Sequence, residues 1–177
     1  MIIGLISDSH GSLRKLAAAM KILTAKRVQT VVHCGDICCF ESVGLLGSLG
    51  IPAWLVAGNM DDQMEELEEA AEASKVAFSR RTVEVPLAGG EYLVATHGND
   101  ENLLHELILG RQFPYVCHGH THRIGNQKLG RTRVICSGAI KGPRGPKFPT
   151  VSILNTDLDQ VEFYDIRQPN TPIRITL

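Results

Sequence analysis

The chain has 177 residues, of which 44% are hydrophobic and 21% are charged. These values are ordinary for a globular protein, so we expect one domain over residues 1–177. Lysine and arginine number 18, and aspartate and glutamate number 19. This balance argues against a long nucleic acid or an anionic membrane as partner, but it is compatible with a small phosphorylated substrate.

The beginning of the chain and its cysteines favour a cytoplasmic protein. Residues 1–8 have no basic start and become polar after six apolar positions, which is typical of a strand rather than a signal peptide or membrane span. The five cysteines are odd in number and contain no Cys-x-x-Cys pair. Reduced thiols are therefore expected instead of a disulfide framework. The oligomeric state stays open.

The first two thirds of the chain alternate short apolar runs with amphipathic stretches, which predicts alternating strands and helices. Strands are predicted over residues 2–6, 30–33, 53–56, 91–95 and 115–117. Helices are predicted after a capping Ser12 and over residues 41–49, 61–73 and 101–109, where the early Asp61 and Asp62 suit a helix N-terminus. Residues 76–85 are interpreted as strand or irregular structure.

The last third of the chain has a different pattern, with no room for long helices. Strands are predicted over residues 126–129, 131–136, 150–155, 160–166 and 173–177. The whole chain therefore predicts a mixed α/β fold, in which sheet layers are covered by helices on the outside.

Seven polar residues lie just past the carboxyl ends of predicted strands, where ligands bind in open α/β sheets. They are Asp8, His10, Asp36, Asn59, His97, His120 and His122. The gaps from 8 to 36, from 36 to 59 and from 97 to 120 are 28, 23 and 23 residues, close to one strand–helix unit each. Glycine stands beside most of these residues, which permits sharp turns.

The side chains in this set predict a metal centre. Two carboxylates, four imidazoles and one amide, without a thiolate, suit manganese, nickel, iron or zinc. Seven ligands are too many for one catalytic metal, but they suit two divalent metal ions that share a bridging carboxylate. Taken singly, each residue is more often a turn or capping residue. Seven in order, each at a strand end, favour the functional interpretation.

Three other histidines are left out of the predicted centre. His33 lies inside a predicted strand and is interpreted as a hydrogen-bonded partner rather than a metal ligand. His105 and His118 are interpreted in the same structural way. The loop over residues 138–149 carries Lys141, Arg144 and Lys147. It could contact phosphate, but a solvated loop is the favoured interpretation.

In these motifs the chain resembles the calcineurin-like metallophosphoesterase superfamily, and more narrowly its small, cap-free bacterial and archaeal phosphodiesterase branch. The family signature runs D-x-H, G-D, G-N, H-G and G-H-x-H. It stands here as Asp8-Ser9-His10, Gly35-Asp36, Gly58-Asn59, His97-Gly98 and Gly119-His120-Thr121-His122.

The resemblance implies a four-layer αββα sandwich of two mixed β-sheets flanked by helices. It implies that one metal ion is held by Asp8, His10 and His122, and the other by Asn59, His97 and His120, with Asp36 bridging. It also implies hydrolysis of phosphodiester bonds, with phosphomonoesters left open, by in-line attack of a metal-bound hydroxide. Asn59 could in addition orient a phosphate oxygen of the substrate.

The chain departs from the family pattern at three places. Met60 stands where many members have a histidine proposed to protonate the leaving group, so the general acid is unassigned. Asn99 replaces a second histidine of the fourth motif, and Cys136-Ser137-Gly138-Ala139 replaces N-P-G-S. Without a histidine acid, leaving groups of low pKa should react best, which predicts activity on bis-p-nitrophenyl phosphate.

Two other functions compete with the enzymatic interpretation. A retromer subunit of the same fold works chiefly as a protein-binding scaffold, but its ligand set is eroded, whereas all seven positions are filled here. Binuclear hydrolases that cleave C–N bonds place His-x-His early, whereas here Asp-x-His comes first. The acidic helix after Asn59 would also repel a long polyanion such as nucleic acid.

Overall fold

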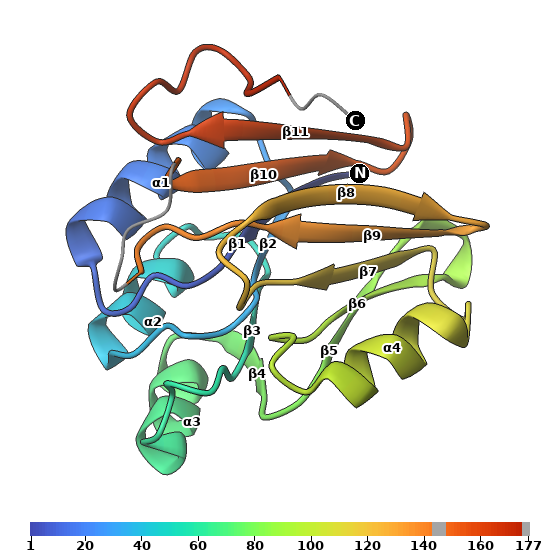
Figure 1. The fold of residues 1–177 in the computed structure, drawn as a ribbon. Helices are drawn as coiled ribbons and strands as arrows, with labels where there is room; N and C mark the ends of the chain where they lie inside the picture. Colours follow the sequence, from blue (N-terminus) through green and yellow to red (C-terminus); the bar gives the residue numbers. More distant parts are fainter. Residues whose placement is uncertain (143–147, 175–177) are drawn as a thin grey trace.

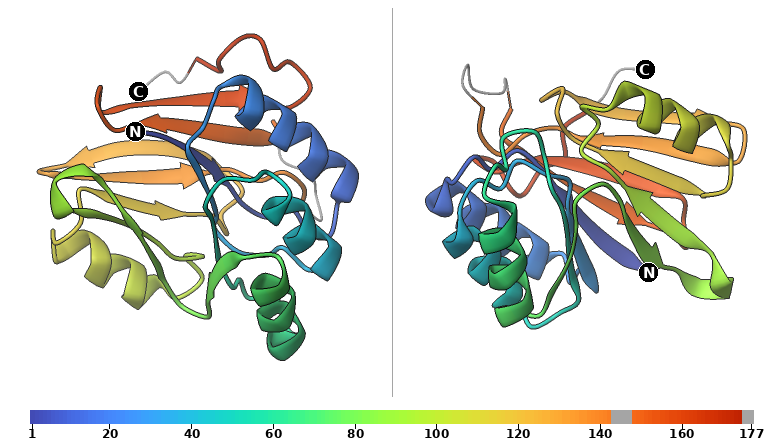
Figure 2. Two further views of the ribbon diagram at one scale, coloured as in Figure 1. Left: turned by 180° about the vertical axis from the view of Figure 1, so that it is seen from behind. Right: turned by 90° about the horizontal axis from the view of Figure 1, so that it is seen from below.

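Two β-sheets face one another, with helices on the outer sides (Figures 1 and 2). The computed structural model describes residues 1–142 and 148–174. This arrangement confirms the predicted mixed α/β sandwich. Within the described ranges, no helix has the length and apolar character needed to cross a membrane.

The first sheet has six strands in the order β11-β10-β1-β2-β3-β4. Its members are β1 (Ile2–Ile6), β2 (Thr30–His33), β3 (Ala53–Val56), β4 (Val76–Ser79), β10 (Thr150–Asn155) and β11 (Gln160–Asp165). Strands β1 to β4 run parallel, and β10 and β11 add antiparallel neighbours beside β1. The loops that follow β1, β2 and β3 therefore leave the sheet at one edge.

The second sheet has five strands in the order β5-β6-β7-β9-β8. They are β5 (Val83–Pro86), β6 (Tyr92–Ala95), β7 (Tyr115–His118), β8 (Ile124–Leu129) and β9 (Thr132–Ser137). Strands β6, β7 and β9 are parallel, whereas β5 and β8 are antiparallel edge strands. A short 3-10 turn at Ala88–Gly90 joins β5 to β6.

Helices α1 (Leu13–Ala25), α2 (Phe40–Gly47) and α3 (Met64–Ala73) lie beside the first sheet, and α4 (Glu101–Leu109) lies beside the second (Figure 2). Two apolar cores result. One joins the first sheet to its helices through residues such as Leu16, Leu23 and Leu55. The other fills the space between the sheets with residues such as Leu5 and Leu93.

Several predicted boundaries need correction. Helix α3 begins at Met64, not at residue 61, because the Asp61 carboxylate is bound by the backbone of neighbouring loops. Residues 76–85 form two strands that belong to different sheets. In the stretch predicted as a last strand, residues 173 and 174 are not in a strand, and the remainder lies outside the described residues. Arg144 and Lys147 also lie outside them.

Candidate metal centre

The loops after the parallel strands of both sheets meet at one edge of the sandwich. The Asp8 N–H donates to the Gly35 carbonyl at 3.0 Å, which joins the loops after β1 and β2. The Gly119 N–H donates to the His97 carbonyl, also at 3.0 Å, which joins the loops after β6 and β7. Each bond ties together two of the segments that carry the predicted site residues.

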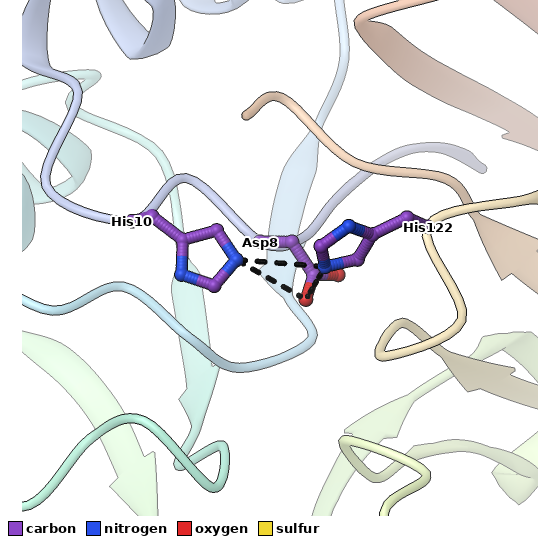
Figure 3. Close-up of side chains that lie close together, drawn as sticks. All are labelled: Asp8, His10 and His122. Atoms are coloured by element: carbon purple, nitrogen blue, oxygen red, sulfur yellow. Dashed lines mark hydrogen bonds and ion pairs between the residues drawn. The ribbon is translucent and has the colours of Figure 1, made fainter. Parts of the chain in front are cut away.

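Asp8, His10 and His122 form the first group of converging side chains (Figure 3). Oδ1 of Asp8 lies 3.1 Å from Nε2 of His122 and 3.9 Å from Nε2 of His10. The two Nε2 atoms are 3.5 Å apart. Ligand atoms of these three residues lie within 4.8 Å of one another, so they could hold a metal ion.

Asp36 joins this group to a second one. Oδ2 of Asp36 lies 3.8 Å from His10 Nε2, whereas Oδ1 lies 3.5 Å from His97 Nε2. His97 Nε2 is in turn 3.1 Å from Oδ1 of Asn59. The rings of His97 and His120 have centroids 5.1 Å apart. All seven predicted residues therefore gather in one place, with Asp36 between the two groups.

The orientation of Asp8 and His97 is fixed by hydrogen bonds behind them. Oδ2 of Asp8 accepts from the Ser7 hydroxyl at 2.5 Å and from the His120 N–H at 3.1 Å, which leaves Oδ1 directed at the histidines. Nδ1 of His97 lies 2.7 Å from the Cys34 carbonyl. If this nitrogen carries the proton, the Nε2 lone pair points into the site, as in metal-bound histidines.

The backbone at the site is unusual, because five of the seven residues have positive φ angles. The angles are 53° at Asp8, 43° at His10, 55° at Asp36, 62° at His120 and 58° at His122. Residues other than glycine rarely adopt this left-handed conformation, and such strain concentrates at functional sites. Tertiary packing therefore holds these side chains in place against local backbone preference.

At two positions of the motifs only glycine fits, because a neighbouring loop approaches its Cα closely. A Cβ on Gly58 would collide with the backbone and carboxylate of Asp36. A Cβ on Gly119 would collide with the Ser7 hydroxyl and would lie 2.7 Å from Oδ2 of Asp8. The glycines beside the candidate ligands thus allow neighbouring loops to touch at the carboxylates.

The electrostatics of the site favour a bound cation. Burial raises the pKa of Asp8 to about 6, although the Ser7 hydrogen bond opposes the shift. Burial also lowers the pKa of His10 and of His122, which favours their neutral, ligating forms. Buried carboxylates that face neutral imidazole nitrogens form a donor set suited to divalent metal ions.

Asp61 is a site component that the sequence interpretation missed. Its side chain is 2% exposed, and its carboxylate accepts from the N–H groups of Gly58 at 2.8 Å, Cys38 at 2.8 Å and Ile37 at 3.3 Å. These groups belong to the loops that carry Asp36 and Asn59. Asp61 therefore holds the two loops against each other. From the sequence alone, this role cannot be told apart from that of an acidic residue at a helix N-terminus.

The three histidines that were not predicted as metal ligands lie in different environments from the candidate ligands. His33 is buried, and its Nε2 lies 3.0 Å from the Ser9 hydroxyl, which agrees with its interpretation as a hydrogen-bonded partner. Burial lowers the pKa of His33 to about 3, so the ring is neutral. His118 is buried beside the Gly119 carbonyl, whereas His105 is exposed on α4.

A cavity of about 420 Å³ opens above the candidate ligands. It is lined by His10, Asp36, Asn59, Met60, His120, His122, Lys141 and Gly142. Lys141 belongs to the loop for which both solvation and phosphate contact were considered from the sequence, and it is exposed while also lining the cavity. The site is therefore open to a small substrate that could reach the metal-binding side chains.

The two-sheet sandwich gathers oxygen and nitrogen donors that suit divalent metal ions, as the sites of metal-dependent hydrolases do. A family model described as the calcineurin-like phosphoesterase superfamily domain matches residues 1–159. The chain belongs to the calcineurin-like phosphoesterase superfamily.

The similar proteins match nearly the whole chain. It is 26% identical over 162 residues to phosphodiesterase MJ0936 of Methanocaldococcus jannaschii, covering 89% of this chain and 94% of that protein. It is 27% identical over 168 residues to the probable metallophosphoesterase YsnB of Bacillus subtilis, with coverages of 91% and 89%. The solved structure of an archaeal phosphodiesterase superposes with a TM-score of 0.83 at 25% identity, covering 92% and 98% of the two chains.

Proposed function

We propose that this protein is a binuclear phosphodiesterase. In this proposal Asp8, His10 and His122 hold one divalent metal ion, and Asn59, His97 and His120 hold the other. Asp36 bridges them, and its placement is the observation that carries the proposal. Its two carboxylate oxygens face different histidines, at 3.8 Å for His10 and 3.5 Å for His97, as a bridging ligand requires.

The donor set fits manganese, nickel, iron or zinc, because it combines imidazole with carboxylate and lacks thiolate. Bound divalent ions at such a site supply a water-derived nucleophile at neutral pH and stabilise negative charge on phosphoryl oxygens. The five cysteines within the described residues are free thiols, which supports the accompanying proposal of a cytoplasmic location.

The protein's own residues would orient the substrate. Asn59 is exposed at the cavity wall and can donate its amide to a phosphate oxygen. Met60, which is 57% exposed beside it, cannot donate a proton. Substrates whose leaving groups need little protonation should therefore react fastest, such as diesters with nitrophenolate leaving groups.

The test is hydrolysis of bis-p-nitrophenyl phosphate by metal-stripped protein, titrated with manganese, nickel, zinc and magnesium. The Asp36→Ala variant is measured beside it. Activity that returns with metal in the wild-type protein but not in the variant is the expected result. Comparable turnover of alkyl and aryl diesters would contradict the argument from Met60.

A protein-binding scaffold of the same fold is the alternative. It gains support only if the purified protein binds metal tightly and hydrolyses no ester with any of the four metals. The seven converging side chains favour the enzyme, because a scaffold has no need for a complete donor set in strained backbone.

A further inference from the structure

Lys141 is carried back to the candidate site by the segment that follows β9. The Ile140 N–H donates to the Ser7 carbonyl at 3.0 Å, and the Lys141 N–H donates to the Asp8 carbonyl at 2.8 Å. Ile140 is fully buried. The backbone of Lys141 is therefore fixed directly against the backbone of a candidate metal ligand.

The side chain of Lys141 is exposed and lies at the cavity. Its Nζ donates to the His10 carbonyl at 3.1 Å, and the residue lines the cavity together with His10 and His122. The next residue, Gly142, is so close to His122 that an added Cβ would collide with the imidazole ring. The ammonium group is thus held beside the first ligand group.

Lys141 is the sole lysine or arginine among the described residues that line this cavity. Its ammonium has three N–H donors, of which the His10 carbonyl accepts one. A flexible four-carbon stem allows the remaining donors to meet an acceptor inside the cavity. Phosphoryl oxygens are such acceptors, and charged hydrogen bonds to them are stronger than neutral ones.

We propose that Lys141 binds a non-bridging phosphoryl oxygen of the substrate and favours substrates with a second negative charge on phosphorus. This inference rests on the proposed phosphoesterase function and assigns Lys141 as a specificity-determining residue. Near neutral pH a phosphomonoester carries almost two negative charges, whereas a phosphodiester carries one. The ammonium therefore stabilises the bound monoester more than the bound diester.

The first measurement is calorimetric titration of the manganese-loaded protein with inorganic phosphate. Lys141→Met should weaken phosphate binding about tenfold, which is the lower range for a charged hydrogen bond. Lys141→Arg should restore most of the affinity because it keeps the charge. Lys21→Met, which removes an exposed lysine on α1, is the matched control and should leave the affinity unchanged.

The second measurement compares two esters with the same leaving group. Lys141→Met should raise KM for p-nitrophenyl phosphate about tenfold and KM for bis-p-nitrophenyl phosphate about twofold or less. A merely structural role for Lys141 would change both by the same factor. Equal factors, or a phosphate affinity no lower than that of Lys21→Met, would overturn the proposal.

The two proposals fail separately. If the wild-type protein hydrolyses neither ester with any metal, the phosphodiesterase proposal is wrong, whereas the phosphate titration still decides whether Lys141 binds a phosphoryl group. If the wild-type protein is active but the Lys141 variants behave like the control, only the assignment of Lys141 is wrong. Thermal unfolding midpoints of the variants establish that the differences are not caused by misfolding.

Discussion

Asp8 and Asp159 are carboxylates at opposite ends of the sandwich, and their surroundings push their pKa values in opposite directions. Asp8 is fully buried, and burial raises its pKa to about 6. Asp159 is 38% exposed and accepts from the Arg133 guanidinium at 2.8 Å and from Lys128 at 2.6 Å. These hydrogen bonds hold the pKa of Asp159 well below its usual range.

The difference separates a functional region from a stabilising one. At the end that carries Asp159, this carboxylate is paired with Arg133 and Lys128, so its ionisation favours the folded state. At the candidate metal centre, Asp8 is buried beside His10 and His122, so its ionisation opposes folding until a cation binds. Four substitutions of aspartate by the nearly isosteric asparagine test this contrast, beginning with the largest expected effect.

Asp36→Asn should lower kcat for bis-p-nitrophenyl phosphate by at least about a thousandfold, because the charge proposed to bridge two metal ions is lost. The amide keeps a side-chain oxygen that can accept from the Met60 N–H, a bond of 2.8 Å in this structure, so the fold should persist. Steady-state kinetics with saturating manganese measure the effect. Asp159→Asn is the control, and equal losses in both variants would remove the distinction between the two regions.

Asp61→Asn should weaken manganese binding about 10- to 100-fold, the usual loss when a group behind a ligand is removed. An amide nitrogen would face backbone N–H groups that now donate to the carboxylate. Calorimetry of the metal-stripped protein measures the affinity. Asp62→Asn, at the exposed neighbouring position, should bind manganese as tightly as the wild type. If both variants retain full affinity, the Asp61 carboxylate is not needed to hold the two loops in the geometry that binds metal.

Asp8→Asn should stabilise the metal-free protein at pH 8 by about 3 kcal/mol, the equivalent of a pKa raised from 3.8 to about 6. The folded state binds this proton more tightly than the unfolded state, so the wild type loses stability as pH rises through about 6. The advantage of the variant should therefore vanish below pH 4. Urea unfolding in a chelator at pH 8, 6 and 4 measures it, and a variant that is less stable throughout would contradict the burial argument.

Asp159→Asn should lower the free energy of unfolding at pH 7 by about 1 kcal/mol, a small value because the pair is partly screened by solvent. The pKa of Asp159 is depressed in the folded state, so its contribution is present above the unfolded pKa near 3.8. The loss should therefore begin to shrink as pH falls below that value, and it should disappear only as pH falls through the lower pKa of the folded state. Urea unfolding at pH 7, pH 4 and pH 2 checks this, with unchanged esterase activity as the control.

Most of the site could be predicted because the sequence indicates where the strands end. Apolar runs such as Ile2–Ile6 end at polar residues beside glycine, and parallel strands place those ends at one edge. Asp8, Asp36 and His97 were found in this way, and the structure brings them within reach of one another. The alternation of strand and helix likewise predicted the mixed α/β fold, whereas the four-layer sandwich was implied by the family resemblance.

The missed features depend on contacts between distant segments. Asp61 was interpreted as a residue of the α3 N-terminus, because an acidic residue before a helical pattern is usually a capping residue. Only the folded loops reveal three N–H donors around its carboxylate. The sequence likewise could not place Lys141 at the site, since its position beside Asp8 is created by a return of the chain after β9.

The left-handed backbone limits how this centre could be transferred to another protein. It occurs at Asp8, His10, Asp36, His120 and His122. Excised peptides that carry the Asp-x-His or His-x-His pair would relax to ordinary backbone conformations. Their side chains would then no longer point toward the same place. A transplanted site would need the whole set of mutually braced loops. By the same reasoning, release of a coloured ion such as cobalt(II) would serve as an optical reporter of unfolding in this protein.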